Sequence, residues 1–226
     1  MSPSIILASK SPRRKEILQD LGFHIRIFHS NIKEVGDSIS QTIEEKVISI
    51  ARKKAIAVSS EIDGGFSKEV ILASDTVVCL GDDILGKPRN RKEAYHMLKK
   101  LSGNKHTVIT ATVILDNNRA LSYEVASTTI VEFKQLSEEV IQEYLDQNMY
   151  MDKAGAYGIQ SNGDQLVNSI HGDYFNVMGL SVKTVVGYFE EYYNEEISTA
   201  ILFNKHGSLI RKFKSDGDND EQTFFK

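Results

Sequence analysis

Two adjacent arginines near the start of the chain are the first residues whose placement suggests chemistry. Arg13 and Arg14 directly follow Ser11-Pro12, a pair typical of a helix start. The unpaired N–H groups of a first helical turn are already electropositive, so each arginine there costs roughly 0.3–1 kcal/mol unless an anion is bound. Guanidinium groups bind phosphate oxygens in pairs, and the hydroxyl of Ser9 can donate beside them. Ser9, Arg13 and Arg14 therefore predict a phosphate site, with solvated surface charges as the alternative.

A carboxylate inside an apolar run is the second such feature. Asp75 lies in the segment 70–80, whose other members are mostly apolar or β-branched. An ionised carboxylate in a buried strand is unfavourable unless it is paired, hydrogen-bonded or bound to a metal. Asp75 is therefore expected to have a partner. Capping of a strand bend by Asp75 is the structural alternative, although aspartate is depleted from strand interiors.

Two loops offer further polar groups. Lys87 lies in Gly86-Lys87-Pro88, where the glycine permits a turn and the proline stiffens the loop, although a single lysine is more often a surface residue. The segment 152–160 is rich in small residues, which allow a flat ligand to approach the backbone. It ends in Gln160, whose amide has the donor and the acceptor that a pyrimidine edge requires. The alternative is a glycine-rich turn with Tyr157 in the core.

The elements that must position these residues alternate between strand and helix. Apolar periodicity predicts strands over 4–8, 24–28, 70–80, 106–115, 124–133 and 165–170. Capping residues and helical spacing predict helices that begin after Ser11, after Ser40 or Thr42, at Arg91, at Ser137 and at Ser181. Asp116-Asn117-Asn118 is the expected turn of a hairpin. The chain is thus predicted to have an α/β fold.

The pattern weakens beyond Glu195. Residues 197–213 predict a small hairpin that turns at Lys205-His206-Gly207, and the polar, acidic residues 215–226 predict a mobile tail. We expect one domain over residues 1–195 and a C-terminal extension over 196–226.

Composition and missing motifs exclude several classes of protein. The 226 residues carry a formal net charge of −4, which gives no broad basic surface for nucleic acid or anionic membrane. Cys79 is the single cysteine and the six histidines are dispersed, which disfavours a structural zinc site. No P-loop or GxGxxG motif is present, and the start of the chain resembles no signal peptide. We expect a cytoplasmic protein that binds neither nucleic acid nor membrane.

Taken together, these segments and one more, LeuSerGlyAsnLysHis (101–106), resemble the Maf family of nucleotide pyrophosphatases over about residues 4 to 192. The five motifs follow the family's order at similar spacing, and they are LeuAlaSerLysSerProArgArgLysGluIleLeu (7–18), Ser74-Asp75-Thr76-Val77-Val78, Gly86-Lys87-Pro88, LeuSerGlyAsnLysHis (101–106) and AspLysAlaGlyAlaTyrGlyIleGln (152–160). The resemblance implies a mixed central sheet in two lobes with a substrate cleft between them, similar to the inosine triphosphatase architecture. It also implies a homodimer.

The resemblance further implies hydrolysis of a nucleoside triphosphate to the monophosphate and pyrophosphate, a house-cleaning reaction on the nucleotide pool. Pro12, Thr76 and Gln160 match the branch that acts on dTTP, UTP, CTP and modified pyrimidine forms such as 5-methyl-UTP, so they are the expected specificity positions. Three residues depart from the family pattern, namely Ser74, Ser161 and Ser181. Ser74 also occurs in a sister branch that prefers 7-methyl-GTP.

The resemblance assigns roles to further residues. A nucleoside triphosphate carries about four negative charges, which must be neutralised during hydrolysis. Lys54 matches a basic residue of the family's second helix and is expected to bind phosphate together with Ser9, Arg13, Arg14 and Lys87. Glu34 matches an acidic residue, and Glu34 and Asp75 are expected to hold Mg²⁺ or Mn²⁺. Asp75 is also the expected proton acceptor, so its role as base, ligand or both stays open.

Two other readings stay open. The first is a purine-directed pyrophosphatase that acts on ITP or 7-methyl-GTP. The second is a non-enzymatic nucleotide-binding regulator of cell division. The joint presence of the arginine pair, Asp75, Lys87 and Gln160 favours an enzyme, because binding alone requires no metal-and-base arrangement.

Overall fold

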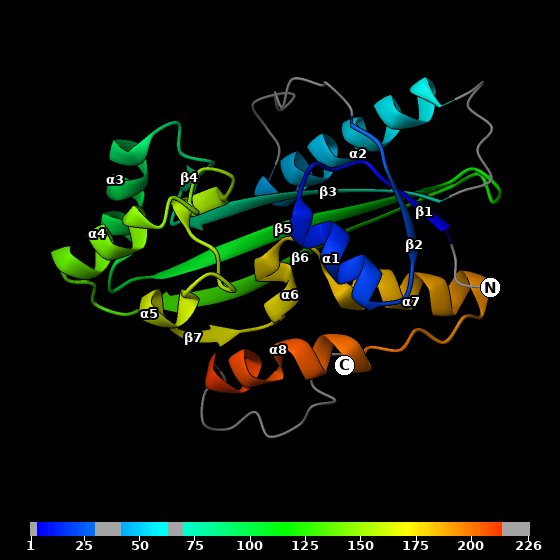
Figure 1. Cartoon of the computed structure of the whole chain (residues 1–226). Coiled ribbons are helices and arrows are strands. Elements are labelled where there is room, and N and C mark those ends of the chain that lie inside the picture. The colour runs from blue at the N-terminus through cyan, green and yellow to red at the C-terminus, as the bar shows by residue number, and fades with distance from the viewer. Residues whose placement is uncertain (1–3, 30–41, 63–69, 214–226) are drawn as a thin grey trace. The chain divides into compact units, whose positions relative to one another are not determined.

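The computed structural model describes residues 4–29, 42–62 and 70–213 (Figure 1). Compactness divides the chain into two units. The first comprises Met1–Asp75, Thr110–Ser127 and Gly179–Lys205, and the second comprises Thr76–Ile109, Thr128–Met178 and His206–Lys226. The boundary at Asp75 falls inside a strand, so the predicted acidic residue ends one unit and its neighbour Thr76 begins the other.

A mixed sheet forms the framework, as the family resemblance implied. Its strands lie in the order β2-β1-β3-β5-β6-β7, and β4 pairs with β3. Pairing is parallel for β1 with β2 and β3, and antiparallel for β3 with β4 and for β6 with β7. The strands are β1 Ser4–Leu7, β2 His24–Ile27, β3 Val70–Leu80, β4 Asp83–Leu85, β5 Lys105–Asp116, β6 Leu121–Phe133 and β7 Val167–His171.

The helices begin at the predicted caps. Ser11, Thr42, Ser137 and Ser181 each accept a hydrogen bond from a backbone N–H of the first turn. Thr42 forms a capping box with Glu45, which satisfies two otherwise unpaired N–H groups. The helices are α1 Pro12–Asp20, α2 Ile43–Glu61, α3 Arg91–Leu101, α4 Glu138–Asp146, α5 Gly163–Leu166, α6 Tyr174–Met178, α7 Val182–Tyr193 and α8 Ala200–Phe213, with a 3-10 turn, η2, at Ala154–Ala156.

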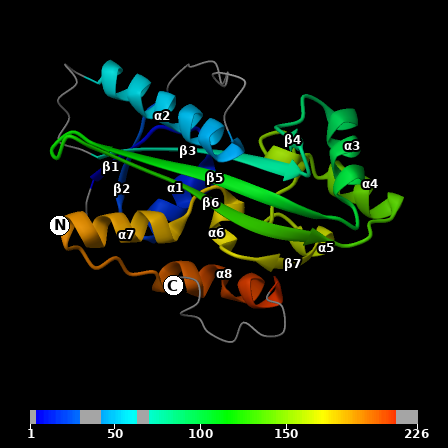
Figure 2. The same ribbon diagram turned by 180° about the vertical axis from the view of Figure 1, so that it is seen from behind.

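In the first unit, helices cover both faces of the strands. Figure 2 shows α2 on one side of β3 and α7 on the other. Covering on both faces explains why β1 and the first half of β3 are apolar runs rather than alternating ones. Ile5, Ile71 and Leu72 are fully buried, as are Ile17 of α1 and Val58 of α2.

The turn between β5 and β6 is fixed by a buried acid of the first unit. Asp116 accepts hydrogen bonds from the hydroxyls of Tyr188 (2.8 Å) and Tyr193 (2.7 Å), and Arg119 forms an ion pair with it at 3.2 Å. Burial alone raises the pKa of Asp116, but the two tyrosines and the arginine together hold that pKa below its usual range. The predicted hairpin is therefore anchored to α7.

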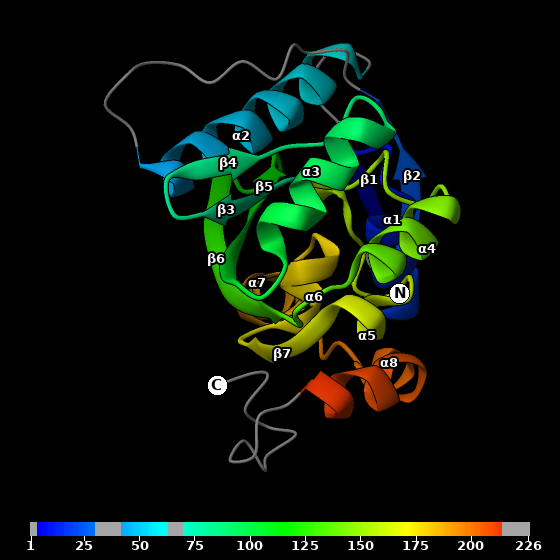
Figure 3. The same cartoon turned by 90° about the vertical axis from the view of Figure 1, so that its left-hand side faces the viewer.

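In the second unit, α3 packs against α4 and against η2. Figure 3 shows α3 and α4 side by side on the face that turns toward the viewer. Their apolar stripes are buried and contain Ala94, Leu98, Leu101, Ile141 and Leu145, all at 0% exposure. This packing fixes the segment that runs through η2, which carries one of the predicted ligand loops.

The predicted C-terminal hairpin is wrong, because Ala200–Phe213 form the helix α8. The turn signal at Gly207 is outweighed by buried residues at helical spacing, namely Leu202, His206, Ile210 and Phe213. Lys205 of α8 forms ion pairs with Glu16 and Asp20 of α1, and Lys212 forms one with Asp164 at 2.7 Å. The division at residue 195 stays a prediction, and residues 214–226 lie outside the described residues.

Candidate active site

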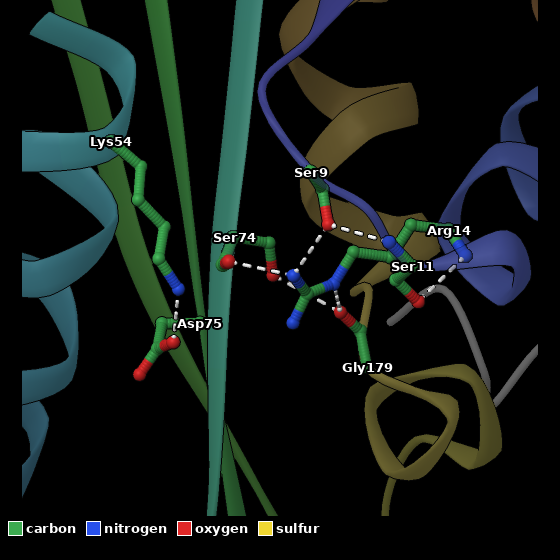
Figure 4. A network of polar contacts seen from close by, with 7 residues as sticks. All are labelled: Ser9, Ser11, Arg14, Lys54, Ser74, Asp75 and Gly179. Carbon is green, nitrogen blue, oxygen red and sulfur yellow. Dashed lines mark hydrogen bonds and ion pairs between the residues drawn. The ribbon is translucent and has the colours of Figure 1, made fainter. Parts of the chain in front are cut away.

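The partner that the sequence demanded for Asp75 is Lys54. The Lys54 Nζ lies 2.6 Å from Asp75 Oδ1, and the two side chains are 12% and 13% exposed. Lys54 comes from α2, whose helical face covers this side of β3 (Figure 4). Among the described residues, Lys54 is the one group that pairs with this carboxylate. A charge-assisted bond of this length in a mostly buried place sets the orientation of the carboxylate, so the capping alternative is not supported.

Arg14 lies on the other side of the same strand. Successive side chains of a strand point to opposite faces, and Figure 4 shows Ser74 and Arg14 on one side of β3 with Asp75 and Lys54 on the other. The Nη1 of Arg14 donates to the carbonyl of Ser74 (2.7 Å) and to Ser9 Oγ (3.0 Å), and its Nε donates to the carbonyl of Gly179 (2.7 Å). The predicted phosphate ligand thus binds protein oxygens.

The loop after β1 carries the remaining phosphate candidates. Ser9 Oγ accepts both from Arg14 and from the N–H of Ser11 (3.2 Å), which leaves its own proton for another acceptor such as a phosphate oxygen. Arg13 is half-buried in the first turn of α1, and Pro12 is exposed as the first residue of that helix. The anion site at the helix start stays a prediction, because Arg14 has protein partners there.

In the second unit, one backbone hydrogen bond joins the two predicted ligand loops. The N–H of Gly155 donates to the carbonyl of Gly86 at 3.1 Å. Gly155 has a φ of +67° and a Cβ there would lie 3.1 Å from both methyl groups of Val78, so glycine is required on both counts. Pro88 is buried while Lys87 is exposed, which presents the lysine to solvent.

Buried side chains hold the late loop from below. Tyr157 is 5% exposed, and its hydroxyl lies 2.8 Å from Nε2 of His106. Tyr144 accepts a hydrogen bond from the N–H of Gly158 at 3.0 Å. Lys153 is buried and pairs with Asp152 at 2.8 Å. Tyr157 therefore lies in the core, as the structural alternative had it, and the core packing positions the loop that carries Gln160.

Gln160 offers an unused acceptor. Its Oε1 is buried and has no hydrogen-bond partner in the parts of the chain that the structure describes. A buried amide oxygen left without a donor is unfavourable by about 1–3 kcal/mol, so a ligand that donates to it would be stabilised. Thr76 is half-buried in the portion of β3 that belongs to the same unit.

The described residues supply half of the expected metal site. Carboxylate oxygens are the ligands that Mg²⁺ and Mn²⁺ prefer, which suits Asp75. Glu34, the second predicted ligand, lies outside the described residues. Across residues 4–29, 42–62 and 70–213 there is no group of three or more His, Cys, Asp or Glu that could hold a metal ion.

Sequence reasoning gave no role to Gly179, although its carbonyl accepts from both Arg14 and Ser74 Oγ (3.0 Å). Backbone acceptors leave no mark in a sequence, so only the departure at Ser74 hinted at this contact. None of the described helices is long and apolar enough to cross a membrane.

Comparison with known proteins agrees with the motif order. The family described as Maf-like protein matches residues 4–192. A dTTP/UTP pyrophosphatase of Pyrococcus abyssi is 44% identical over 80% of this chain and 92% of its own length. Proteins of the same name from Fusobacterium nucleatum (44% identity, 79% and 90% coverage) and Bacillus velezensis (42% identity, 85% and 98% coverage) are similar. Matches of this extent to full-length relatives establish that the chain belongs to the Maf family.

Proposed function

We propose that this chain is a nucleoside triphosphate pyrophosphatase that converts dTTP and UTP to the monophosphate and pyrophosphate. The observation that carries the proposal is the ion pair between Asp75 of β3 and Lys54 of α2. Asp75 follows Ser74, whose carbonyl Arg14 binds, and relatives of this chain are named dTTP/UTP pyrophosphatase. A fixed carboxylate beside cationic groups is what hydrolysis of a phosphoric anhydride requires.

In this reaction Asp75 accepts the proton of the attacking water. The water oxygen forms a bond to the α-phosphorus, the bond from that phosphorus to the bridging oxygen breaks, and pyrophosphate leaves with the electron pair. Lys54 holds the carboxylate in place at 2.6 Å and supplies positive charge beside it. Ser9, Arg13 and Lys87 bind phosphate oxygens, whereas Arg14 donates to protein oxygens of Ser9, Ser74 and Gly179.

A divalent cation completes the proposed site. Asp75 and Glu34 would hold Mg²⁺ or Mn²⁺, which when bound neutralises phosphate charge and lowers the pKa of a bound water. The carboxylate of Asp75 suits such an ion, since Lys54 occupies one of its two oxygens and the other has no protein partner among the described residues.

We propose that Gln160, Thr76 and Pro12 select the nucleotide base. The buried, unpartnered Oε1 of Gln160 would accept from the N–H at position 3 of uracil or thymine. Pro12 and Thr76 are the other proposed specificity residues. We extend the substrate class to CTP and 5-methyl-UTP, and we propose a cytoplasmic homodimer that removes surplus or modified nucleotides.

The test is pyrophosphate release from UTP, dTTP, CTP, 5-methyl-UTP, ITP and 7-methyl-GTP with Mg²⁺ or Mn²⁺. Asp75→Asn keeps an acceptor for Lys54 but removes the base, so kcat is expected to fall by roughly 100-fold or more with the fold intact. Asp83→Asn is the matched control. Asp83 pairs with Lys100 on the surface, so this substitution should leave kcat unchanged.

Each alternative has its own signature in this panel. Preference for ITP or 7-methyl-GTP would replace the pyrimidine assignment by the purine-directed one. If every nucleotide binds but none is hydrolysed, the chain is a nucleotide-binding regulator. Full activity of Asp75→Asn would remove Asp75 from the mechanism.

A further inference from the structure

We infer that Arg14 is a positioning residue that fixes the backbone before Asp75, and that it is not a phosphate ligand. The inference rests on the proposed function for its catalytic readout. A basic residue in a first helical turn is ordinarily expected to bind an anion. In Arg14, however, the guanidinium nitrogens point to the carbonyls of Ser74 and Gly179 (Figure 4).

The hydrogen-bond ladder between β1 and β3 ends just before Ser74. Pairing between these parallel strands runs to Leu7 and Leu72, and the N–H of Ala8 then donates to the carbonyl of Leu72 at 2.8 Å. Carbonyls of a strand point to the same side at every second residue, so the next one toward β1 is that of Ser74. The chain has by then turned into the loop that leads to α1, and no β1 N–H follows.

Arg14 takes the place of the missing donor. Its Nη1 lies 2.7 Å from the Ser74 carbonyl, as close as a ladder hydrogen bond and charge-assisted as well. A buried carbonyl left without a donor would be unfavourable, and Ser74 is itself fully buried. Arg14 therefore ends the ladder and holds the peptide that joins Ser74 to Asp75.

Arg14 and Ser74 also share a second backbone acceptor, the carbonyl of Gly179. Both Arg14 Nε (2.7 Å) and Ser74 Oγ (3.0 Å) donate to the Gly179 carbonyl. Gly179 has a φ of +109°, a conformation that side chains disfavour, so its carbonyl is presented by a turn that only glycine forms readily. One guanidinium thus ties the loop after β1, the strand β3 and the turn before α7.

The carboxylate of Asp75 lies on the face of β3 that α2 covers, whereas Arg14 approaches from the opposite side (Figure 4). The planar fork of arginine matches three protein oxygens here, namely the carbonyls of Ser74 and Gly179 and the hydroxyl of Ser9. Lysine has one nitrogen and cannot reproduce this set.

The experiment compares Arg14→Lys and Arg14→Gln with Arg13→Gln, the neighbouring residue that stays assigned to phosphate. For both Arg14 variants we expect kcat to fall by roughly 100-fold while the Kd for pyrophosphate, measured by calorimetry with Mg²⁺, changes by less than about threefold. Arg13→Gln should instead weaken pyrophosphate binding. Arg91→Gln, at a surface ion pair with Asp146, controls for the loss of charge.

A readout independent of activity keeps the inference testable even if the native chain hydrolyses none of the nucleotides. Amide hydrogen exchange over residues 70–80 should become faster in Arg14→Gln and stay native-like in Arg13→Gln. A loss of pyrophosphate affinity in Arg14→Lys, or unchanged exchange and kcat in Arg14→Gln, would overturn the positioning role. Absence of hydrolysis by the native chain would overturn the proposed function alone.

Discussion

Lys54 and Asp75 depend on each other because neither is exposed enough for water to replace its partner. Each side chain is less than one-seventh exposed, and the bond between them is 2.6 Å long. In such a place the removal of one member leaves a charge that solvent screens poorly. The main effect of the ion pair is therefore to hold the Asp75 carboxylate at a fixed position, and its contribution to the stability of the fold is smaller in importance.

His106 is the residue whose environment predicts a pH effect. It is 2% exposed, and burial lowers its pKa from 6.5 to about 4. The imidazole of His106 therefore binds a proton near pH 6.5 in the unfolded chain, but only near pH 4 in the native chain. The neutral, buried imidazole of His106 therefore makes its full contribution to stability above pH 6.5. This contribution amounts to roughly 3 kcal/mol and is lost as the pH falls toward 4.

Urea unfolding of the native chain and His106→Gln at pH 7, 5 and 4 measures this contribution. Glutamine can keep a hydrogen bond to Tyr157 but does not titrate, so the variant should lose less stability than the native chain between pH 7 and 4. His24→Gln, at an exposed position of β2, is the matched control for loss of a histidine. Equal pH dependence in His106→Gln and the native chain would contradict the assignment.

At the scale of elements, one backbone hydrogen bond connects the loop that carries Lys87 to the loop that carries Gln160. The N–H of Gly155 in η2 donates to Gly86, which precedes the proposed phosphate ligand Lys87. The packing of η2 against α3 holds this arrangement. Pro88 of the lysine loop is also buried, so we expect the hydrogen bond from Gly155 to help fix the position of Lys87.

Gly155→Ala should disturb both loops. The positive φ and the 3.1 Å approach to Val78 predict a loss of about 1–2 kcal/mol in the free energy of unfolding, together with a higher KM for UTP. Gly187→Ala in the interior of α7 is the matched control. It meets no atom within 4 Å, so it should stabilise the chain by about 0.5–1 kcal/mol without changing KM. Chemical denaturation and initial rates measure the two effects, and a Gly155→Ala protein with native stability and KM would refute the coupling.

At the scale of the whole molecule, the segment beyond the Maf match is part of the packed structure. Residues 4–192 match the family, but α8 buries Leu202, Ile210 and Phe213 to 0%, 4% and 2% exposure. His206 packs its ring against Tyr174 and Phe175 at centroid distances of 5.8 and 5.7 Å. The helix is thus held by apolar burial and by the ion pairs of Lys205 and Lys212.

Truncation after Asn194 should therefore destabilise the chain. Loss of three buried side chains is expected to remove roughly 5 kcal/mol or more, which is comparable to the whole stability of many domains. Thermal unfolding and solubility of the shortened chain measure this effect. Truncation after Phe213 removes no described residue and serves as the control. A stable, soluble chain ending at Asn194 would show that α8 is dispensable.

The sequence by itself determined the fold class and most of the longer helices and strands. Helix starts at Ser11, Thr42, Ser137 and Ser181 were predictable because a cap acts on N–H groups two or three residues away. The strand 70–80 was predictable because strands buried on both faces are continuous apolar runs. The hairpin expected over residues 197–213 failed because a local turn signal competed with burial that the sequence does not display.

Only the tertiary structure decided which groups meet. Lys54 and Asp75 are 21 residues apart, and the carbonyls that bind Arg14 lie 60 and 165 residues away from it. A main-chain oxygen has the same chemistry in every residue. No pattern of side chains could therefore predict that Arg14, the expected phosphate ligand, would donate to these two carbonyls. The residue types thus limited the chemistry, while the places where β1 ends and where Gly179 turns determined which partners each charge has.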